Sequence, residues 1–262
     1  MKKLIALVLV ITSLCLCLCL AGCGGKGVTM EKLQKSGELV IATSPDFPPF
    51  ESLDGTGKVF GIEIDILESI CADLGVELKI EQMDFDSVLP GVQAGKFTLG
   101  ASGISITPKR EKNTLFTVPY CLAAQAIVVK EGSAIASKAD LDGKKVSVQT
   151  GTTAETFCME NGYKVNSYTA NDDAKLALVM DKVDAWVIDD LTAAEMVALY
   201  NEENEDQLVI LPEAMTTEPY AFAMPFGYEE VVEEINGILN GLVKDGTVAS
   251  IFEKFEAPYT QP

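Results

Sequence analysis

Apolar and polar positions along the chain follow the pattern of an α/β protein, in which short apolar strands alternate with amphipathic helices. Leu39–Ala42 is predicted to be a short buried strand, and the turn-rich segment Thr43–Pro49 closes it. Apolar residues then recur at helical spacing from Ile62 to Leu74, and Gly75 is placed to end that helix. The pattern continues with a strand at 77–81, a helix that begins at 86 or 87 and runs to 92, and a strand at 99–102.

A second block of alternating elements follows residue 130. Strands are predicted at 145–149, 164–168, 185–188 and 208–211, helices at 172–180 and 192–200, and a mostly helical segment at 228–255 that is interrupted at 245–247. Thr152 and Glu155 have the spacing of a capping box, which predicts a further helix start. Two similar α/β blocks indicate two lobes, and a cleft between lobes is a common site for a small molecule.

The N-terminal residues have the features of an export signal. A basic start at Lys2–Lys3 precedes a seventeen-residue apolar run, Leu4–Leu20, and small residues then lead to Cys23. A single membrane-spanning anchor is the alternative, because seventeen residues lie at the lower edge of the length that spans a bilayer.

The tetrapeptide Leu20–Cys23, with the sequence Leu-Ala-Gly-Cys, resembles the processing site of bacterial lipoproteins. The resemblance implies a lipoprotein signal peptide at 1–22 and acylation of Cys23, with chains such as palmitate. Residues 23–36 would then form a lipid-anchored tether, because more than one acyl chain gives stable attachment. We therefore expect the protein outside the cytoplasm, held at the cell membrane through its N-terminal lipid alone.

The chain is strongly acidic, with a formal net charge of −19. Removal of residues 1–22 would take away two lysines and no acidic residues, so the charge would fall from −19 to −21. Such a chain is not expected to bind nucleic acid or an anionic membrane surface through general electrostatics. The one true acidic run, Glu202–Asp206, is expected to be a solvated loop.

Cysteine and histidine usage argues against a disulfide framework and a metal centre. Four of the seven cysteines belong to the signal and lipid site, and Cys71, Cys121 and Cys158 remain as an odd, widely spaced set. Each of these three lies among apolar neighbours and is expected to be a small buried hydrophobe. The chain has no histidine, so neither a zinc site nor a His-based catalytic triad is expected, and no metal or cofactor is predicted.

Arg110 is the only arginine in a chain that has nineteen lysines. Guanidinium binds planar anions through two parallel hydrogen bonds, which ammonium cannot form, so a single retained arginine suggests anion recognition. The donor-rich stretch Ser102–Ile106 precedes it, and Thr107 as N-cap with Pro108 at the first helical position predicts a helix start. From position alone, the alternative is a solvated arginine in the first turn of a surface helix.

Six segments occur in the order and spacing expected for one protein family. They are Gly37–Ala42 (GELVIA), Phe47–Glu51 (FPPFE), Gly61–Asp65 (GIEID), Ser105–Arg110 (SITPKR), Val148–Thr153 (VQTGTT) and Val183–Asp189 (VDAWVID). Over residues 37–256 the chain resembles the extracellular solute-binding proteins of the polar amino-acid type, family 3, which are the capture subunits of ABC importers.

The resemblance implies a two-lobed α/β fold, the type II periplasmic-binding-protein fold, with the second lobe inserted in the first. Lobe 1 is expected at 37–120 and 218–262, lobe 2 at 125–213, and the two crossover segments of the hinge at 120–124 and 213–217. The lobes are expected to close around one free amino acid. The protein would act as a monomer that delivers this ligand to the permease of an ABC importer, and it is not expected to be an enzyme.

The resemblance also implies which groups bind the two charges of the amino acid. Arg110 would bind the carboxylate, with further donors from Ser105, the backbone near Gly103, and Thr153 at a helix start. The Asp189 carboxylate, the Gly103 carbonyl and the Ser105 hydroxyl would accept hydrogen bonds from the ammonium. Asp189 follows a predicted strand, at the sheet edge where α/β proteins bind ligands, although it could instead serve only as a helix N-cap.

Four further positions match those that contact the side chain of the ligand. Phe47 and Phe85 would cover it and shield the ion pairs from water, although either ring could simply be part of the core. Ser44 and Gln149 match the specificity positions, and Ser44 stands where relatives for cationic amino acids often carry an acid. Because Gln149 is also uncharged and Ile188 makes one wall apolar, we expect a neutral amino acid.

Two other functions remain open at this point. A few relatives on the same scaffold are dehydratases of small carboxylic acids, but the absence of histidine and of a second acid that can be placed in the cleft argues against an enzyme. The chain could also present its ligand to a membrane signalling receptor, a role that would need a separate membrane protein.

Overall fold

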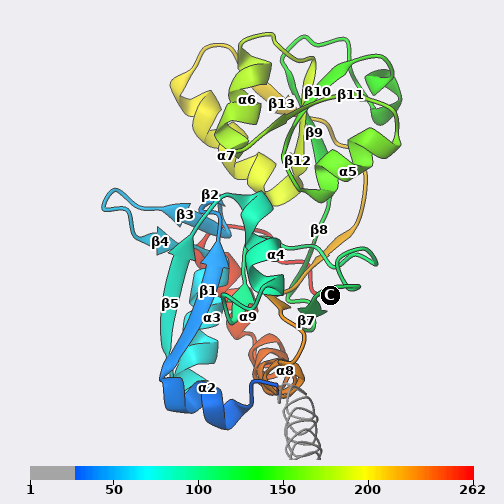
Figure 1. The fold of residues 1–262 in the computed structure, drawn as a ribbon. Helices are drawn as coiled ribbons and strands as arrows, with labels where there is room; N and C mark the ends of the chain where they lie inside the picture. The colour runs from blue at the N-terminus through cyan, green and yellow to red at the C-terminus, as the bar shows by residue number, and fades with distance from the viewer. Residues whose placement is uncertain (1–26) are drawn as a thin grey trace, which may run out of the picture.

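The computed structural model describes residues 27–262 as two α/β lobes joined by two strands (Figure 1). The expected signal peptide at 1–22 and the expected lipidation site at Cys23 lie outside the described residues. Within the described part of the chain, no helix is both long enough and apolar enough to cross a membrane.

The first lobe is built on a five-stranded sheet whose strands come from distant parts of the chain. In spatial order they are β5 (Glu77–Gln82), β1 (Glu38–Thr43), β6 (Leu99–Gly100), β15 (Ala223–Met224) and β7 (Leu115–Phe116). β1 is parallel to β5 and β6, whereas β15 is antiparallel to β6 and β7. Because β15 comes late in the chain and yet lies between β6 and β7, the second lobe is an insertion into the first, as predicted.

Four helices of the first lobe follow the apolar spacing of the sequence. They are α3 (Ile62–Leu74), α4 (Phe85–Gln93), α8 (Glu229–Lys244) and α9 (Thr247–Lys254). Helix α3 has the predicted bounds, and Gly75 ends it with a φ of 69°, the left-handed conformation that glycine adopts without strain. The break between α8 and α9 at residues 245–246 falls within the predicted interruption.

A short helix, α2 (Met30–Ser36), forms where the sequence suggests only a tether. The Thr29 hydroxyl caps its start, and the apolar side chain of Leu33 is buried in the core of the first lobe. The Val28 N–H donates a hydrogen bond to the Gly227 carbonyl at 2.8 Å, just before α8. The described part of the expected tether is therefore docked on the first lobe.

The second lobe repeats the arrangement of the first. Its sheet consists, in spatial order, of β11 (Lys164–Tyr168), β10 (Lys145–Gln149), β12 (Ala185–Asp189), β9 (Gln125–Lys130) and β13 (Leu208–Ile210). β10 is parallel to β11 and β12, and β9 is antiparallel to β12 and β13. The helices of this lobe are α5 (Thr153–Glu160), α6 (Asn171–Val179) and α7 (Asp190–Glu203), with a short 3-10 helix at Lys138–Leu141. The prediction of two similar lobes is confirmed.

Two paired strands carry the chain between the lobes, and Figure 1 shows β8 in this position. β8 (Cys121–Ala123) lies within the first expected crossover, whereas β14 (Glu218–Tyr220) begins one residue after the second, which is expected at 213–217. β8 and β14 are antiparallel, with Cys121 opposite Tyr220. The lobes are therefore connected by one hydrogen-bonded ribbon rather than by two independent loops.

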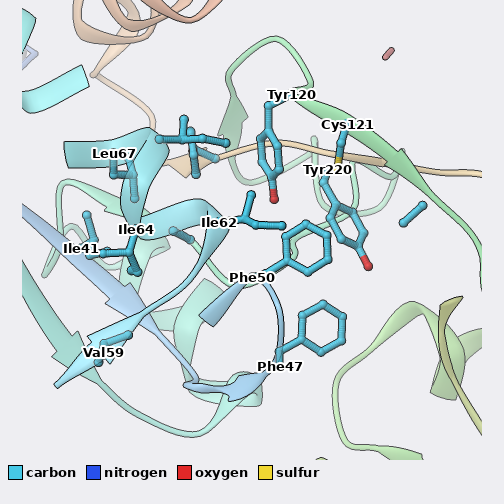
Figure 2. Close-up of a cluster of buried hydrophobic side chains, with 14 of the residues drawn as sticks. Ile41, Phe47, Phe50, Val59, Ile62, Ile64, Leu67, Tyr120, Cys121 and Tyr220 are labelled. Atoms are coloured by element: carbon cyan, nitrogen blue, oxygen red, sulfur yellow. The ribbon is translucent and has the colours of Figure 1, made fainter. Parts of the chain in front are cut away.

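Aromatic side chains from distant segments meet beside this ribbon. A small sheet of β2 (Asp46–Phe47), β3 (Glu51–Leu53) and β4 (Val59–Phe60) leads to Phe47 and Phe50. Figure 2 shows their rings close to those of Tyr120 and Tyr220, with Ile62 beside them. Ring centroids are 5.7 Å apart for Phe47 and Phe50 and 5.2 Å apart for Phe50 and Tyr220. This packing holds the Pro-rich loop after β1 against the crossover strands.

The three cysteines of the described residues are buried thiols without disulfide partners. Their side chains contribute to the apolar cores, which agrees with the prediction that they are small buried hydrophobes. Burial raises the pKa of Cys71 to about 11 and the pKa of Cys158 to about 12, so neither thiol is activated as a nucleophile.

Candidate functional site

A small cavity lies between the lobes, at the carboxyl ends of β10 and β12. Its volume is about 10 Å³, which leaves room for about one water molecule. It is lined by Phe47, Phe85, Ser102, Gly103, Ser105, Arg110, Gln149, Thr152, Thr153 and Asp189. Eight of the nine positions expected to contact a ligand belong to this set. Ser44 is the exception, and its backbone N–H donates to the Ser102 hydroxyl at 3.1 Å beside the cavity.

Arg110 lies in a hydrogen-bonded turn rather than at the start of a helix. The Thr107 hydroxyl accepts from the Arg110 backbone N–H at 3.2 Å, as an N-cap would, but residues 108–113 form turns that lead toward β7. The guanidinium donates to the Ser105 carbonyl at 2.8 Å and to the Gly151 carbonyl of the second lobe at 3.3 Å. The predicted helix start is therefore wrong, and so is the alternative of a solvated arginine, because the half-buried side chain is held between the lobes.

Acidic and aromatic groups surround the Arg110 guanidinium. Burial lowers the pKa of Arg110 from its usual value, while the charges of Glu218 and Asp189 oppose this shift. The Phe85 ring centroid lies 5.9 Å from the guanidinium carbon, within the range of a cation–π contact. Guanidinium has more N–H donors than these two hydrogen bonds use, so donors remain for an anion in the cavity.

The turn at Ser102 and Gly103 brings the backbone to the cavity wall. Gly103 has a φ of 54°, and a Cβ atom placed there would lie 2.4 Å from the Cε1 atom of Phe47. Only glycine fits both the left-handed backbone and the close approach of this ring. Two buried acids hold the turn, because Glu51 accepts from the Ser102 hydroxyl at 2.9 Å and Glu63 accepts from the Gly103 N–H at 3.1 Å.

Asp189 ends β12 and occupies the N-cap position of α7, but its side chain makes no capping hydrogen bond. Instead, Oδ2 accepts from the Tyr220 hydroxyl at 2.5 Å, and Oδ1 accepts from the Gln125 amide. The carboxyl group therefore faces the cavity and does not serve as a helix cap. Burial raises the pKa of Asp189 to about 8; the Tyr220 hydrogen bond opposes the shift, and the nearby Glu218 charge adds to it.

The start of α5 brings hydroxyl groups to the same cavity. The Thr152 hydroxyl accepts from the Glu155 N–H at 3.1 Å, and the Glu155 carboxylate accepts from the Gly151 N–H at 2.8 Å. The predicted capping box forms with its return bond one residue earlier than the usual pattern. Thr153 is the first residue of α5, so its backbone lies at the positive end of the helix dipole, and its hydroxyl accepts from Gln125 at 3.2 Å.

A polar cluster of Ser44, Asp46, Gln149 and Asn171, which we call the interlobe cluster, joins the lobes at the expected specificity positions. Ser44 donates to Oδ1 of Asp46 at 2.9 Å. The Gln149 amide and the Asn171 backbone N–H, both from the second lobe, donate to Oδ2 at 3.0 and 2.9 Å. Burial raises the pKa of Asp46, and these hydrogen bonds oppose the shift. The cluster thus supplies a second link between the lobes besides Arg110.

Six residues at or beside the cavity are missing from the predicted ligand contacts: Ser102 and Thr152, which line it, and Asp46, Gln125, Glu218 and Tyr220. Glu218 is only 6% exposed and its charge acts on both Arg110 and Asp189, which corrects the expectation that no second acid lies in the cleft. Gln125, Glu218 and Tyr220 all lie next to the crossover segments. Polar residues directly beside a predicted crossover are the signal that could have identified them.

A larger groove of about 710 Å³ adjoins the cavity between α4 and α5. Phe85, Arg110, Thr152 and Thr153 line both spaces, so Arg110 stands at the boundary between the small cavity and the groove. Glu218 also faces the groove.

The cavity has a basic group on one wall, Arg110 of the first lobe, and an acidic group on the other, Asp189 of the second. Ser105 and Thr153, which both carry a hydroxyl group, and the rings of Phe47 and Phe85 also line it. This arrangement complements a small molecule that carries both an anionic and a cationic group. Within residues 27–262, no group of three or more acidic or cysteine side chains is placed to hold a metal ion.

Several known proteins are similar to this chain over most of its length. The L-cystine-binding protein TcyJ of Escherichia coli K12 is 27% identical over 230 residues, which cover 86% of this chain and 85% of TcyJ. An ancestral arginine-binding protein bound to glutamine is 38% identical with a TM-score of 0.79, and the match covers 85% of this chain and 99% of that one. The ancestral amino acid-binding protein AncCDT-1, a precursor of cyclohexadienyl dehydratase, is 33% identical with a TM-score of 0.79, covering 86% of this chain and 98% of that one.

A match to a whole family covers nearly all of the described residues. The sequence profile for bacterial extracellular solute-binding proteins, family 3, aligns with residues 39–257, which include both lobes, the crossover strands and every residue of the cavity. The chain therefore belongs to the bacterial extracellular solute-binding proteins of family 3.

Proposed function

We propose that this solute-binding protein captures a free α-amino acid outside the cytoplasmic membrane and delivers it to the permease of an ABC importer. The observation that carries the proposal is the placement of Arg110 and Asp189 on opposite lobes around one cavity. An α-amino acid carries its carboxylate and its ammonium group on the same carbon atom, and these two side chains supply the complementary charges over that short span.

Arg110 is assigned to the ligand carboxylate. Separation of its Nη2 atom from the Gly151 carbonyl would free a second N–H, so that the fork could bind the carboxylate with two parallel bonds. Ser105 and Thr153 supply further donors on either side, and the start of α5 adds a favourable dipole.

Asp189 is assigned to the ligand ammonium, together with the Gly103 carbonyl and the Ser105 hydroxyl. Tyr220 and Gln125 orient its carboxyl group from the crossover strand and from β9. A neighbouring ammonium would favour the ionised carboxylate, which burial alone disfavours. The Asp189 carboxylate and the ligand ammonium therefore stabilise each other's charge only while the ligand is bound.

A neutral side chain remains our proposal for the ligand. Phe47, Phe85 and the Gln149 amide line the cavity without charge, and Asp46, the acid nearest to Ser44, already accepts three hydrogen bonds. The ancestral relative that is described as arginine-binding and is bound to glutamine supports both a neutral and a cationic ligand. A cationic side chain would require Asp46 to exchange its interlobe contacts for the ligand.

Hinge closure is the proposed mechanism of capture. Lobe 1 would comprise 37–120 and 218–262, and lobe 2 would comprise 125–213, with the hinge at 120–124 and 213–217. A cavity of about 10 Å³ is too small for an amino acid, so entry requires the lobes to separate and then close again. β8 in the first hinge segment pairs with β14, which directly follows the second, so this pairing keeps the two crossovers together during that motion.

Lipid anchoring at Cys23 is the proposed mode of attachment to the membrane, after removal of the signal peptide at 1–22. Val28 is hydrogen-bonded to Gly227, so a lipid at Cys23 would hold the protein by its first lobe and leave the second free to move. A palmitate analogue should label the wild-type protein in cells, and Cys23→Ser should be unlabelled and leave the membrane fraction. A labelled or membrane-bound Cys23→Ser protein would contradict the assignment.

A thermal-shift panel of the twenty amino acids and cystine tests the proposed function, with protein that has been refolded free of ligand. A ligand at 100-fold its Kd should stabilise the fold by about 2.7 kcal/mol. We expect one or a few amino acids to raise the melting temperature and their decarboxylated amines to have no effect, because Arg110 would lack its partner. No shift by any amino acid, or equal shifts by sugars, would refute the proposal.

Binding without turnover is the last part of the proposal. The relationship to a dehydratase precursor and the presence of Glu218 in the cleft make an assay with prephenate-like acids the appropriate control. We expect no elimination product, and a measurable product would show that the protein is an enzyme. Co-purification with a permease rather than a signalling receptor would support the transport role, with the protein itself as a monomer.

A further inference from the structure

Two glutamates lie behind the ligand cavity, with their side chains completely buried. Glu51 from β3 and Glu63 from the first turn of α3 are both 0% exposed. None of the ion pairs in residues 27–262 involves either carboxyl group. The Glu63 backbone N–H donates at 3.1 Å to the carbonyl of Phe50, the residue before Glu51, and the two carboxyl groups hold adjacent residues of the Ser102–Gly103 turn, so they lie close together. Two ionised carboxylates in such a site would repel each other strongly, because burial removes the screening by water and no ion pair among the described residues supplies a compensating charge. One of the two is therefore expected to carry a proton.

The hydrogen bonds around this pair show where a shared proton would lie. Both oxygens of Glu63 accept, one from the Tyr120 hydroxyl at 2.6 Å and the other from the Gly103 N–H at 3.1 Å. Oε1 of Glu51 accepts from the Ser102 hydroxyl at 2.9 Å, whereas Oε2 is buried and receives no donor. Oε2 of Glu51 is therefore the oxygen that can carry the proton and donate it to Glu63.

We propose that Glu51 and Glu63 form a carboxylic acid–carboxylate pair, with the proton on Glu51, that positions the Ser102–Gly103 turn against the amino-acid ligand. The inference rests on the proposed function of the cavity, to which both turn residues belong. Neither glutamate lines the cavity, so both are positioning residues that act through the turn.

Electrostatics agree with this assignment. Burial raises the pKa of Glu51 well above its usual value, and the neighbouring charge of Glu63 adds to the shift. Burial also raises the pKa of Glu63, but the hydrogen bonds from Glu51, Tyr120 and Gly103 oppose it. The other titratable groups that face the pair are Asp46, which raises the pKa of Glu51 further, and the weakly acidic side chains of Tyr120 and Cys121.

Isosteric amides at the two positions test the proposal. In Glu51→Gln, the amide N–H would replace the proton and the amide oxygen would still accept from Ser102. We expect its affinity for the amino acid selected by the thermal-shift panel to stay within about threefold of wild type. In Glu63→Gln, only one acceptor remains for the two donors Tyr120 and Gly103, so affinity should fall by about tenfold or more. Glu68→Gln, on the exposed side of α3, is the matched control and should bind like wild type.

The pH dependence of folding provides a second test that does not need a ligand. A carboxyl whose native pKa is raised gives stability that is complete below the unfolded pKa, about 4.5, and is lost as pH rises through the native pKa. The slope of the urea unfolding free energy against pH gives the number of protons taken up on folding. Above pH 5, this number should be about one lower for Glu51→Gln than for wild type. This holds even if Glu63→Gln does not fold.

The outcomes separate the pair from the proposed function. Equal losses of affinity in Glu51→Gln and Glu63→Gln, wild-type affinity in both, or an unchanged proton uptake in Glu51→Gln would each overturn the pair. Failure of the wild-type protein to bind any amino acid would instead refute the proposed function, and the proton uptake would still test the pair.

Discussion

The two lobes build their faces of the cleft in different ways. On the first lobe, groups that line the cavity have hydrogen-bond partners in the same lobe, although Arg110 also donates to Gly151 of the second lobe. The Ser102–Gly103 turn is fixed from behind by Glu51 and Glu63, and the Arg110 guanidinium is oriented by the Ser105 carbonyl. The Ser102–Gly103 turn therefore keeps its hydrogen bonds to these two acids without any contact from the second lobe.

On the second lobe, the cavity residues stand where strands end and helices begin, and several reach across the cleft. Gln149 donates to Asp46 of the first lobe, and Asp189 accepts from Tyr220 of the crossover ribbon. The difference suggests that the first lobe provides the binding surface and that the second lobe provides contacts that form on closure. Substitutions on the first face should therefore weaken binding directly, whereas those on the second should also change the balance between open and closed forms.

The largest effect is expected for Arg110→Lys. One ammonium cannot provide the paired N–H donors of guanidinium, so affinity for the amino acid should fall at least about 100-fold, or about 3 kcal/mol. Isothermal titration calorimetry measures this loss, and the melting temperature without ligand reports whether the fold is kept. The double variant Lys109→Arg, Arg110→Lys is a control that keeps one arginine but moves it by one residue. Wild-type affinity in Arg110→Lys would make its role purely structural.

A somewhat smaller loss is expected for Asp189→Asn on the opposite face. The amide cannot neutralise the ligand ammonium, so affinity should fall about 30-fold, or about 2 kcal/mol. Asp184→Asn is the matched control, because Asp184 lies just before β12, is exposed, and accepts only from the Lys145 N–H at 2.8 Å. Equal affinities of the two variants would contradict the assignment of Asp189 to the ammonium.

The fold could be predicted from the sequence wherever local signals decide the structure. The strands at 145–149 and 164–168 and the helix at 62–74 have the predicted bounds, because apolar spacing and a terminal glycine are local features. Strands as short as β7 and β15 could not be predicted, since only their pairing with distant strands defines them. The helix start at Thr107 was a local signal that the path toward β7 overrides.

The residues of the site also fall into those that sequence signals predict and those that they do not. Arg110 and Asp189 could be proposed from the sequence because matched segments carry them and because Arg110 is the only arginine. Asp46 could not, since no local signal indicates its burial or the partners that it meets from the other lobe. A buried polar residue acquires its role from the groups that the fold brings to it, and that information is not local.

The pH dependence of binding should reveal the protonation of Asp189. Because its pKa lies at about 8 and a bound ammonium would lower it, binding at pH 6 to 7 should release about one proton. Affinity should rise about tenfold between pH 6 and pH 7 and level off above about pH 8. Calorimetry in buffers with different ionisation enthalpies measures the release, and Asp189→Asn should abolish it. Proton uptake, or no pH dependence in the wild type, would contradict this prediction.

Folding stability should respond to the same group in the opposite direction. Since the native pKa of Asp189 is raised, its contribution is complete below the unfolded value of about 4 and is lost as pH rises through about 8. Asp189→Asn should therefore gain stability relative to wild type over that range in the absence of ligand. Denaturant unfolding at several pH values measures the difference.

The smallest effect is expected for Asp46→Asn in the interlobe cluster. This variant also tests most directly whether the two lobes differ in the way described. An amide cannot accept from Ser44, Gln149 and Asn171 together, so the closed form should lose part of its support without any loss at the charged end of the cavity. Affinity for a neutral amino acid should fall about fivefold, because the competent closed form is less populated. Small-angle scattering without ligand should show a larger radius of gyration than for wild type and for the exposed control Asp73→Asn. If instead arginine binding fell far more than glutamine binding and the radius stayed unchanged, Asp46 would bind a cationic ligand side chain and would not act as a link between the lobes.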